Sequence, residues 1–347
     1  MNNVSSSDPN LARENFYKRI ATENCAPLWE VLHTLVPPTP PSLCQPYLWQ
    51  WKTMWPWMQE AGRLITAKEA ERRVLVLENP GLRGGSRITQ SLYAGLQLVL
   101  PGEIAPAHRH TQSALRFVIQ GKGAYTAVDG QRVTMNVGDF VITPTWTWHD
   151  HGNDSDEPMV WMDGLDVPIV ELFNAQFFER PGVEVQRVHG DERANLAMFG
   201  YAMKPVEYAR KSKTSPLFWY PYERSREALD VLQRSQEAHP AFGHKLQYTN
   251  PVTGGWPMPT IGTFIQLLPG GFRGRPYQAT DASVFSVVEG SGSCTVGGTT
   301  LKFEAKDVFV CPSWLPYTLE ASTETVLFSF SDRPAQQALD LWRESAS

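Results

Sequence analysis

Hydrophobic positions along the chain change their spacing near residue 74, and the change separates a helical part from β-rich parts. In residues 9–36 the apolar side chains recur at the three-to-four-residue spacing of an amphipathic helix: Leu28, Val31, Leu32 and Leu35. The proline-rich residues 37–41 should end this helix. A second, short helix is expected over residues 66–73, where Thr66 and Glu69 have the spacing of a capping box.

From residue 74 the apolar residues form short runs separated by glycine, asparagine and proline turns, which is typical of a β-sandwich or barrel. We expect a helical N-terminal segment over residues 1–73 and a first barrel over 74–176. A linker with helical stretches should follow over 177–249. A second barrel is expected over 250–332, and a C-terminal helix over 333–347.

The second β-rich block repeats the first. Four motifs recur in the same order: Asn79-Pro80 with Gly84-Gly85 and Asn250-Pro251 with Gly254-Gly255, LVLPGEI and QLLPGGF, FVIQGKGAYTAVDG and SVVEGSGSCTVGG, and GDFVITPTW and KDVFVCPSW. One such match can arise by chance, whereas four in one order indicate duplication. The chain is therefore predicted to contain two copies of one small barrel.

Composition and charge exclude several classes of protein. The chain is 42% hydrophobic and 19% charged, as in globular proteins, and its net charge is −5 with no long basic run. We therefore expect neither nucleic acid nor an anionic membrane as partner. The four cysteines form no CxxC pair, the first residues do not resemble a secretory signal, and no long apolar stretch occurs. A cytoplasmic location is expected.

Four of the eight histidines lie close together in the first barrel, as two HxH pairs. His108 and His110 form one pair, and His149 and His151 form the other. Residues two apart on a strand point to the same face, so two adjacent strands can place three imidazoles around one ion. Imidazole suits iron, copper, zinc and nickel. The alternative is that these are interior or surface histidines without a metal.

The segments around these histidines resemble the two cupin motifs. Gly102 is followed after five residues by HxH, and Gly121 closes the first motif; GDFVITPTWTWHDHGN resembles the second. Ala114 and Leu115 stand where the wider family carries a glutamate, which leaves three histidines. The strings AHRHTQSALRF and TWHDHGN are similar to the gentisate 1,2-dioxygenase family with its salicylate and 1-hydroxy-2-naphthoate relatives. The resemblance implies a mainly β bicupin with two jelly-roll barrels.

The resemblance also implies a function. It predicts one iron(II) per chain, held by His108, His110 and His149, and cleavage of gentisate by dioxygen to maleylpyruvate. The partners would then be a small aromatic hydroxy acid and O2. Two alternatives stay open: a 1,2-dioxygenase for salicylate, a substituted salicylate or 1-hydroxy-2-naphthoate, and a non-catalytic binding or storage bicupin. Members are commonly tetrameric, and the aromatic segment 47–57 would fit a subunit interface.

The second barrel is predicted to lack a metal. By the spacing of the repeat, Tyr277, Ala279 and Tyr317 stand at the positions of the three ligands. None of these side chains is an imidazole, so the second barrel should serve structure and assembly.

Several further residues are candidates for the chemistry. His151 shares the strand face of His149 and is expected to be a base or hydrogen-bond partner, with a packing or fourth-ligand role as the alternative. Arg116 should point inward and bind the substrate carboxylate, or form a salt bridge with Asp163 instead. Asp163 is expected to orient His151 or to bind a ring hydroxyl.

The resemblance adds three pocket candidates. Gln97 and Tyr93 are similar to family positions that line the pocket, although packing would explain both. Arg72 lies in a segment similar to one that reaches the site in the family, or it simply ends a surface helix.

Overall fold

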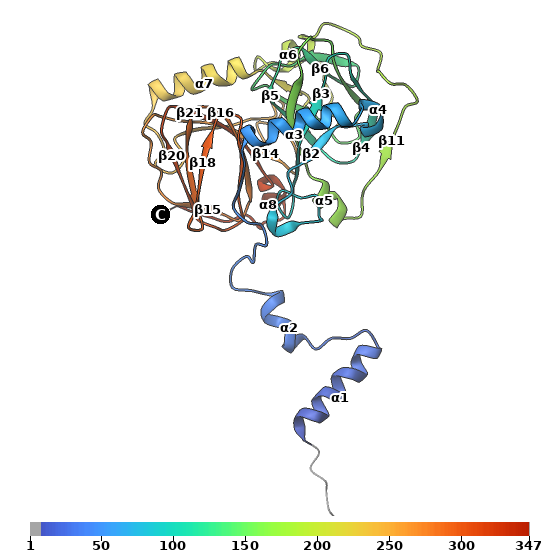
Figure 1. Cartoon of the computed structure of the whole chain (residues 1–347), viewed down its shortest axis with the longest axis vertical. Coiled ribbons are helices and arrows are strands. Elements are labelled where there is room, and N and C mark those ends of the chain that lie inside the picture. Colours follow the sequence, from blue (N-terminus) through green and yellow to red (C-terminus); the bar gives the residue numbers. More distant parts are fainter. Residues whose placement is uncertain (1–7, 347) are drawn as a thin grey trace, which may run out of the picture. The chain divides into compact units, whose positions relative to one another are not determined.

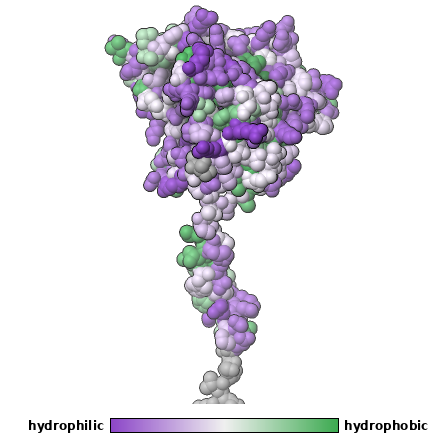
Figure 2. All heavy atoms as spheres, turned by 90° about the vertical axis from the view of Figure 1, so that its left-hand side faces the viewer, coloured by the Kyte–Doolittle hydropathy of each residue, from purple (hydrophilic) through white to green (hydrophobic). Residues whose placement is uncertain are grey.

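The computed structural model describes residues 8–346, and the chain divides into two compact units at Pro41 and Ser42. The first unit holds α1 (Pro9–Thr22) and α2 (Leu28–Leu35). The single helix predicted over 9–36 is therefore wrong, because the chain turns between them with Asn24 at a positive φ of 55°. None of the residues of these two helices is buried, and Figure 2 shows hydrophobic side chains on this helical segment.

The first barrel is built from two antiparallel sheets (Figure 1). The six-stranded sheet runs in the order β12 (Trp219–Tyr220), β8 (Phe140–Thr143), β5 (Ala114–Gln120), β10 (Met159–Leu165), β3 (Tyr93–Val99) and β2 (Val74–Val76). The five-stranded sheet runs β11 (Phe178–Glu179), β4 (Ile104–His110), β9 (His149–Asn153), β6 (Ala124–Val128) and β7 (Gln131–Thr134).

The second barrel has the same strand order. Its six-stranded sheet is β1 (Tyr47–Trp49), β19 (Val308–Cys311), β16 (Ser283–Glu289), β21 (Thr325–Ser331), β14 (Gly262–Leu268) and β13 (His244–Gln247). Its five-stranded sheet, read in the corresponding direction, is β22 (Glu344–Ala346), β15 (Tyr277–Ala279), β20 (Tyr317–Ala321), β17 (Ser291–Val296) and β18 (Thr299–Glu304). The predicted mainly β bicupin is confirmed, with jelly-roll sheets that do not close into complete barrels.

The two six-stranded sheets pack against each other. Phe117 on β5 stacks on Phe328 on β21 with ring centroids 4.0 Å apart, and Phe140 lies 5.5 Å from the same ring. One core cluster of buried residues accordingly includes strands of both barrels. Burying these faces against each other removes a large apolar area from water.

Two segments, which we call arms, each add a strand to one barrel and then pack a helix on the other. β1 pairs with β19 of the second barrel, and α3 (Trp51–Leu64), which follows it, packs Gly62 against Leu98 and Leu100 of the first. In the opposite sense, β12 pairs with β8 of the first barrel, and α7 (Tyr222–Ser235) runs along β13 and β14 of the second (Figure 1). Strand pairing therefore does not follow the predicted segment boundaries.

The two arms are anchored alike. Asp307 accepts a hydrogen bond from the first N–H of α3 at 2.7 Å, and Asp139 accepts one from the first N–H of α7 at 2.8 Å. Each aspartate thus supplies a buried acceptor and a negative charge at a helix N-terminus.

The remaining elements are short. They are α4 (Ala67–Ala70), η1 (Pro80–Leu82), α5 (Val167–Leu172), α6 (Ala194–Phe199) and α8 (Arg333–Ala338). The capping box of Thr66 and Glu69 is confirmed, but its helix ends at Ala70. The predicted C-terminal helix is wrong beyond Ala338, because the chain then enters β22 on the second barrel. Within residues 8–346, no helix has the length and apolarity that a membrane crossing needs.

Candidate metal centre

Neighbouring strands bring three histidines together. β4 pairs with β9 so that His108 lies opposite His149, and a bulge in β4 precedes this pair. One ring nitrogen from each of His108, His110 and His149 lies within 4.8 Å of the other two. Among the residues that the structure describes, this is the one such group of potential metal ligands.

Backbone carbonyls fix the orientation of all three rings. The Nδ1 atoms lie near backbone oxygens, His108 at 3.2 Å from Pro106, His110 at 2.9 Å from Gln112, and His149 at 2.9 Å from Thr147. In neutral His110 and His149 a proton on Nδ1 donates to such a carbonyl and leaves the lone pair on Nε2. The Nε2 atom of His149 is buried and has no hydrogen-bond partner. The three rings are therefore oriented so that they could hold a metal ion.

The electrostatics of the cluster keep the imidazoles neutral. Burial, with the charge of Arg72, lowers the pKa of His108 to about 2, and burial lowers that of His110 to about 4. Burial also holds the pKa of His149 well below its usual range. Neutral imidazoles have free lone pairs at physiological pH, and a set of three nitrogen donors suits a first-row transition metal ion.

Arg72 reaches the cluster. Its Nη2 atom donates to the carbonyl oxygen of Pro106 at 2.6 Å and contacts Nδ1 of His108. Burial and the nearby charge of Arg116 lower the pKa of Arg72 to about 10, which leaves it protonated at neutral pH. The structure therefore brings two guanidinium groups into one region beside the histidines.

Arg116 and Asp163 face each other across β5 and β10. Nε of Arg116 lies 3.4 Å from Oδ1 of Asp163, and Nη1 donates to Oγ1 of Thr143 at 2.6 Å. Neither Nε nor that Oδ1 has a hydrogen-bond partner, so the ion pair is close but poorly aligned. Burial raises the pKa of Asp163 to about 6. The salt bridge considered from the sequence is thus present, and Asp163 makes no hydrogen bond to His151.

His151 lies beside the cluster on the same strand as His149, with ring centroids 5.6 Å apart. Its Nδ1 atom shares a hydrogen bond with the hydroxyl of Thr126. Its Nε2 atom is buried without a partner, and burial holds the pKa of the ring well below its usual range. The ring therefore has one fixed edge and one edge free for a ligand. Thr126 was not among the residues chosen from the sequence.

Tyr93 and Gln97 lie on β3, next to the strand of Asp163. Gln97 is 2% exposed. Burial raises the pKa of Tyr93, and the charge of Asp163 raises it further. Gly95, which no sequence motif singles out, lies between them: a Cβ there would come 2.8 Å from the Tyr93 hydroxyl and 2.4 Å from Val74. A glycine inside a strand is the signal that marks such close approach.

A cleft of about 830 Å³ leads from the surface to His108 and Arg72. It is bounded by α4, the start of β4 and residues 178–184. Phe178 places its ring 5.5 Å from that of His108, and an ion pair between Arg180 and Glu71 of 2.5 Å joins two of the bounding segments. This cleft gives a small molecule access to the histidine cluster.

The second barrel repeats the geometry without the ligands. Tyr277 on β15 lies opposite Tyr317 on β20, as His108 lies opposite His149. The Tyr277 hydroxyl donates to Glu344 of β22 at 2.8 Å and accepts from Arg333 at 3.0 Å. The site of the repeat is therefore filled by a hydrogen-bonded network that includes the C-terminal strand.

Comparison with known proteins agrees with this geometry. The family model for the cupin domain matches residues 95–167. A gentisate 1,2-dioxygenase of Aquipseudomonas alcaligenes is 57% identical over 96% of both chains, and a 5-aminosalicylate 1,2-dioxygenase of Comamonas is 34% identical over 95% of this chain and 89% of its own. The salicylate 1,2-dioxygenase of Pseudoaminobacter salicylatoxidans, solved with gentisate, superposes with a TM-score of 0.93 at 35% identity and covers 100% and 97% of the two chains. This chain belongs to the gentisate 1,2-dioxygenase family of cupin ring-cleaving dioxygenases.

Proposed function

We propose that the protein is an iron(II)-dependent gentisate 1,2-dioxygenase, which cleaves the ring between the carboxyl-bearing carbon and the adjacent hydroxyl-bearing carbon and yields maleylpyruvate. The observation that carries the proposal is the cluster of three neutral, backbone-oriented histidines beside two arginines. The 57% identity to a gentisate 1,2-dioxygenase over nearly the whole chain supports the same substrate.

His108, His110 and His149 would hold the iron through their Nε2 atoms. Bound iron(II) would supply Lewis acidity toward the substrate hydroxyl and the redox capacity that reaction with dioxygen requires. With three neutral ligands the ion keeps its full positive charge, and open coordination positions remain for an anionic substrate. We propose one iron per chain, because Tyr277 and Tyr317 replace ligands in the second barrel.

The two arginines would hold the substrate carboxylate. Arg116 and Arg72 are close enough for their like charges to affect each other, and Asp163 balances only part of that charge. An anion between them would relieve the repulsion and accept hydrogen bonds from the guanidinium forks. We therefore assign the substrate carboxylate to this part of the cavity.

His151 would receive or hold the proton of the substrate hydroxyl. Thr126 fixes Nδ1, and the unpartnered Nε2 faces the buried interior. A neutral imidazole in that state is able to accept a proton or to hydrogen-bond the bound anion. We assign Asp163 and Tyr93 to the ring hydroxyl far from the carboxylate, and Gln97 to the wall beside the ring, since all three are on adjoining strands.

Oxygen uptake by the iron(II)-loaded protein tests the proposal. Gentisate, salicylate, 5-aminosalicylate and 1-hydroxy-2-naphthoate should be compared at equal concentration, and gentisate should give the highest kcat/KM with one O2 consumed per substrate. Higher kcat/KM for salicylate or 5-aminosalicylate would favour the second candidate, which the 34% identity to the Comamonas enzyme supports. Iron-loaded protein that consumes no oxygen with any of them would favour a binding protein.

We also propose a homo-oligomer, as a tetramer in the cytoplasm. Apolar residues of α2 remain exposed, including Leu28, Leu32 and Leu35, and Trp57 of the aromatic segment is 57% exposed. Exposed apolar surface of this kind favours association between copies. Light scattering of the full chain measures the mass directly.

A further inference from the structure

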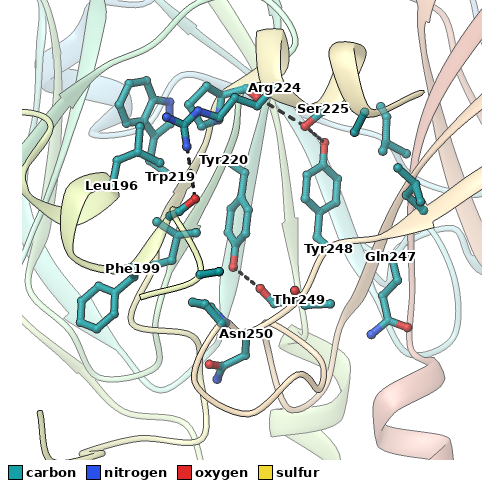
Figure 3. A pocket seen from close by; sticks show the side chains of 18 of the residues that line it. Leu196, Phe199, Trp219, Tyr220, Arg224, Ser225, Gln247, Tyr248, Thr249 and Asn250 are labelled. Carbon is teal, nitrogen blue, oxygen red and sulfur yellow. Dashed lines mark hydrogen bonds between the residues drawn. The ribbon is translucent and has the colours of Figure 1, made fainter. Parts of the chain in front are cut away.

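A second cavity lies away from the metal centre, between β12, α7 and the chain that follows β13 (Figure 3). Its volume is about 500 Å³, which is within the range of small-molecule sites of roughly 300–1,000 Å³. Aromatic side chains form much of its wall, with Trp219 and Tyr220 on β12, Tyr248 beyond β13, and Phe199 on α6. None of the residues assigned to the metal centre lines it.

Hydrogen bonds and ring contacts hold the aromatic wall of this cavity. The Tyr220 hydroxyl donates to the carbonyl oxygen of Thr249 at 2.9 Å, and the Tyr248 hydroxyl donates to Ser225 at 3.0 Å (Figure 3). The Tyr220 oxygen also lies 3.0 Å from the Ser215 hydroxyl, from which it can accept. Both rings also pack on Phe140 of the first barrel, at 5.0 and 4.8 Å between centroids. The flat apolar faces are thus held in place by their polar ends, which favours a flat apolar ligand.

One charge faces this wall. Arg224 is the single charged side chain among the lining residues, and none of them is acidic. Its Nη1 atom donates to the carbonyl oxygen of Gly200 at 3.2 Å, and its guanidinium lies 4.2 Å from the ring of Tyr201. Within residues 8–346 Arg224 takes part in no salt bridge with an acid. A guanidinium has five N–H donors, so most of its donors are free for an anion.

We propose that this cavity binds an aromatic carboxylate, with the carboxylate on Arg224 and the ring against Trp219 and Tyr220. A dicarboxylate or phosphate fits less well, because one guanidinium stands in an otherwise apolar lining. The site is separate from the metal centre: Trp219 pairs with Val141 of β8, and Val141 pairs with Arg116 of β5 on its other side. One strand therefore lies between the cavity wall and the strand that carries Arg116.

Calorimetric titration of the full-length, iron-loaded protein with 2-naphthoate under anaerobic conditions tests this site. This probe has a carboxylate and a flat ring but no ortho hydroxyl with which to chelate iron. One site per chain is expected, with binding weaker by at least about tenfold in Arg224→Gln, because a charge-assisted hydrogen bond is lost. Arg224→Lys should recover part of the affinity, and Arg116→Gln should bind as the wild type does.

Further variants separate the cavity from the metal centre and from an interface. Ala228→Trp, on an exposed turn of α7 that lines the cavity, should abolish binding by filling it. Turnover of gentisate by Arg224→Gln should be unchanged. The proposal for this cavity can therefore be wrong while the proposed dioxygenase activity is right. Titration with gentisate in place of 2-naphthoate shows whether the substrate itself uses the site.

Four outcomes would overturn the proposal. Unchanged binding by Arg224→Gln would remove the carboxylate contact, and loss of binding in Arg116→Gln instead would place the ligand at the metal centre. A smaller mass of Ala228→Trp by light scattering would show that a second copy of the chain covers the cavity. If titration of the wild-type protein with 2-naphthoate gives no heat of binding, the cavity does not bind an aromatic carboxylate and the proposal is wrong.

Discussion

Replacing His151 tests the division of roles between the two histidines of β9. His151 makes one polar contact, through Nδ1 to Thr126, and its Nε2 is buried without a partner. The alanine variant should keep near-normal iron, because His108, His110 and His149 form a complete group without it. It should lose at least about a hundredfold in kcat/KM, since general acid–base groups contribute about 10²–10⁴-fold, or about 3–5 kcal/mol of barrier.

The structure also predicts a graded series. Thr126→Val removes the hydroxyl that fixes His151 but keeps its shape, so it should cost about 1 kcal/mol, or roughly fivefold in kcat/KM. His151→Gln serves as a second variant, because alanine at this fully buried position leaves a cavity. His149→Ala is the comparator and should lose both iron and activity.

Metal analysis and oxygen uptake measure the two quantities on the same samples, with circular dichroism as a check on folding. If His151→Ala loses iron and His149→Ala keeps it, then His151 is the metal ligand and His149 is the base or hydrogen-bond partner. Retained iron with full activity in both His151 variants would leave His151 as a packing residue.

Three further predictions concern the metal and the buried acids. Fully loaded protein should contain one iron per chain by elemental analysis, since Tyr277 and Tyr317 occupy the repeat site; a value near two would contradict the assignment. Calorimetry of metal binding at pH 6, in buffers of different ionisation enthalpy, should detect almost no proton release, whereas three histidines of ordinary pKa would release about two. Burial raises the pKa of Asp166 from 3.8 to about 6, so the folded protein favours the protonated carboxyl. The contribution of this group to the free energy of unfolding is complete below pH 3.8 and is lost as the pH rises through about 6. Urea unfolding should therefore show the wild type losing about 1 kcal/mol relative to Asp166→Asn between pH 5 and pH 8, and a difference that does not change with pH would contradict it.

The ligand cluster was predictable because its geometry is local. An HxH pair on a strand fixes a common face, and the repeat fixes which residues of the second barrel correspond. The structure places His108 opposite His149 and Tyr277 opposite Tyr317, as those two rules require. The partner of Asp163 was left open, because it depends on which strands become neighbours.

The elements that were missed or wrong depend on contacts distant in sequence. α3 contains Pro56 and four tryptophans lie in or near it, so its sequence carries little helical signal, and its stability comes from packing against the barrels. β22 follows α8 with no strand-like pattern and exists because the edge of β15 is available. Gly95 is needed because β2 pairs with β3 and leaves no space for a Cβ beside Val74, and this pairing cannot be read from the sequence.

The crossed arms have a consequence for the order of assembly during synthesis. The outer strand of the first barrel, Trp219–Tyr220, leaves the ribosome long after the rest of that barrel, and the Tyr47–Trp49 strand must wait for Val308–Val310. The second barrel can therefore be completed only when nearly the whole chain exists, whereas the strands of the first barrel are all present once Tyr220 has been made. A chain without the second barrel would expose the apolar face of the six-stranded sheet of the first. Its Tyr47–Trp49 strand would also have no strand to pair with. The second barrel thus contributes to the core of the first, although tyrosines stand at two of its ligand positions.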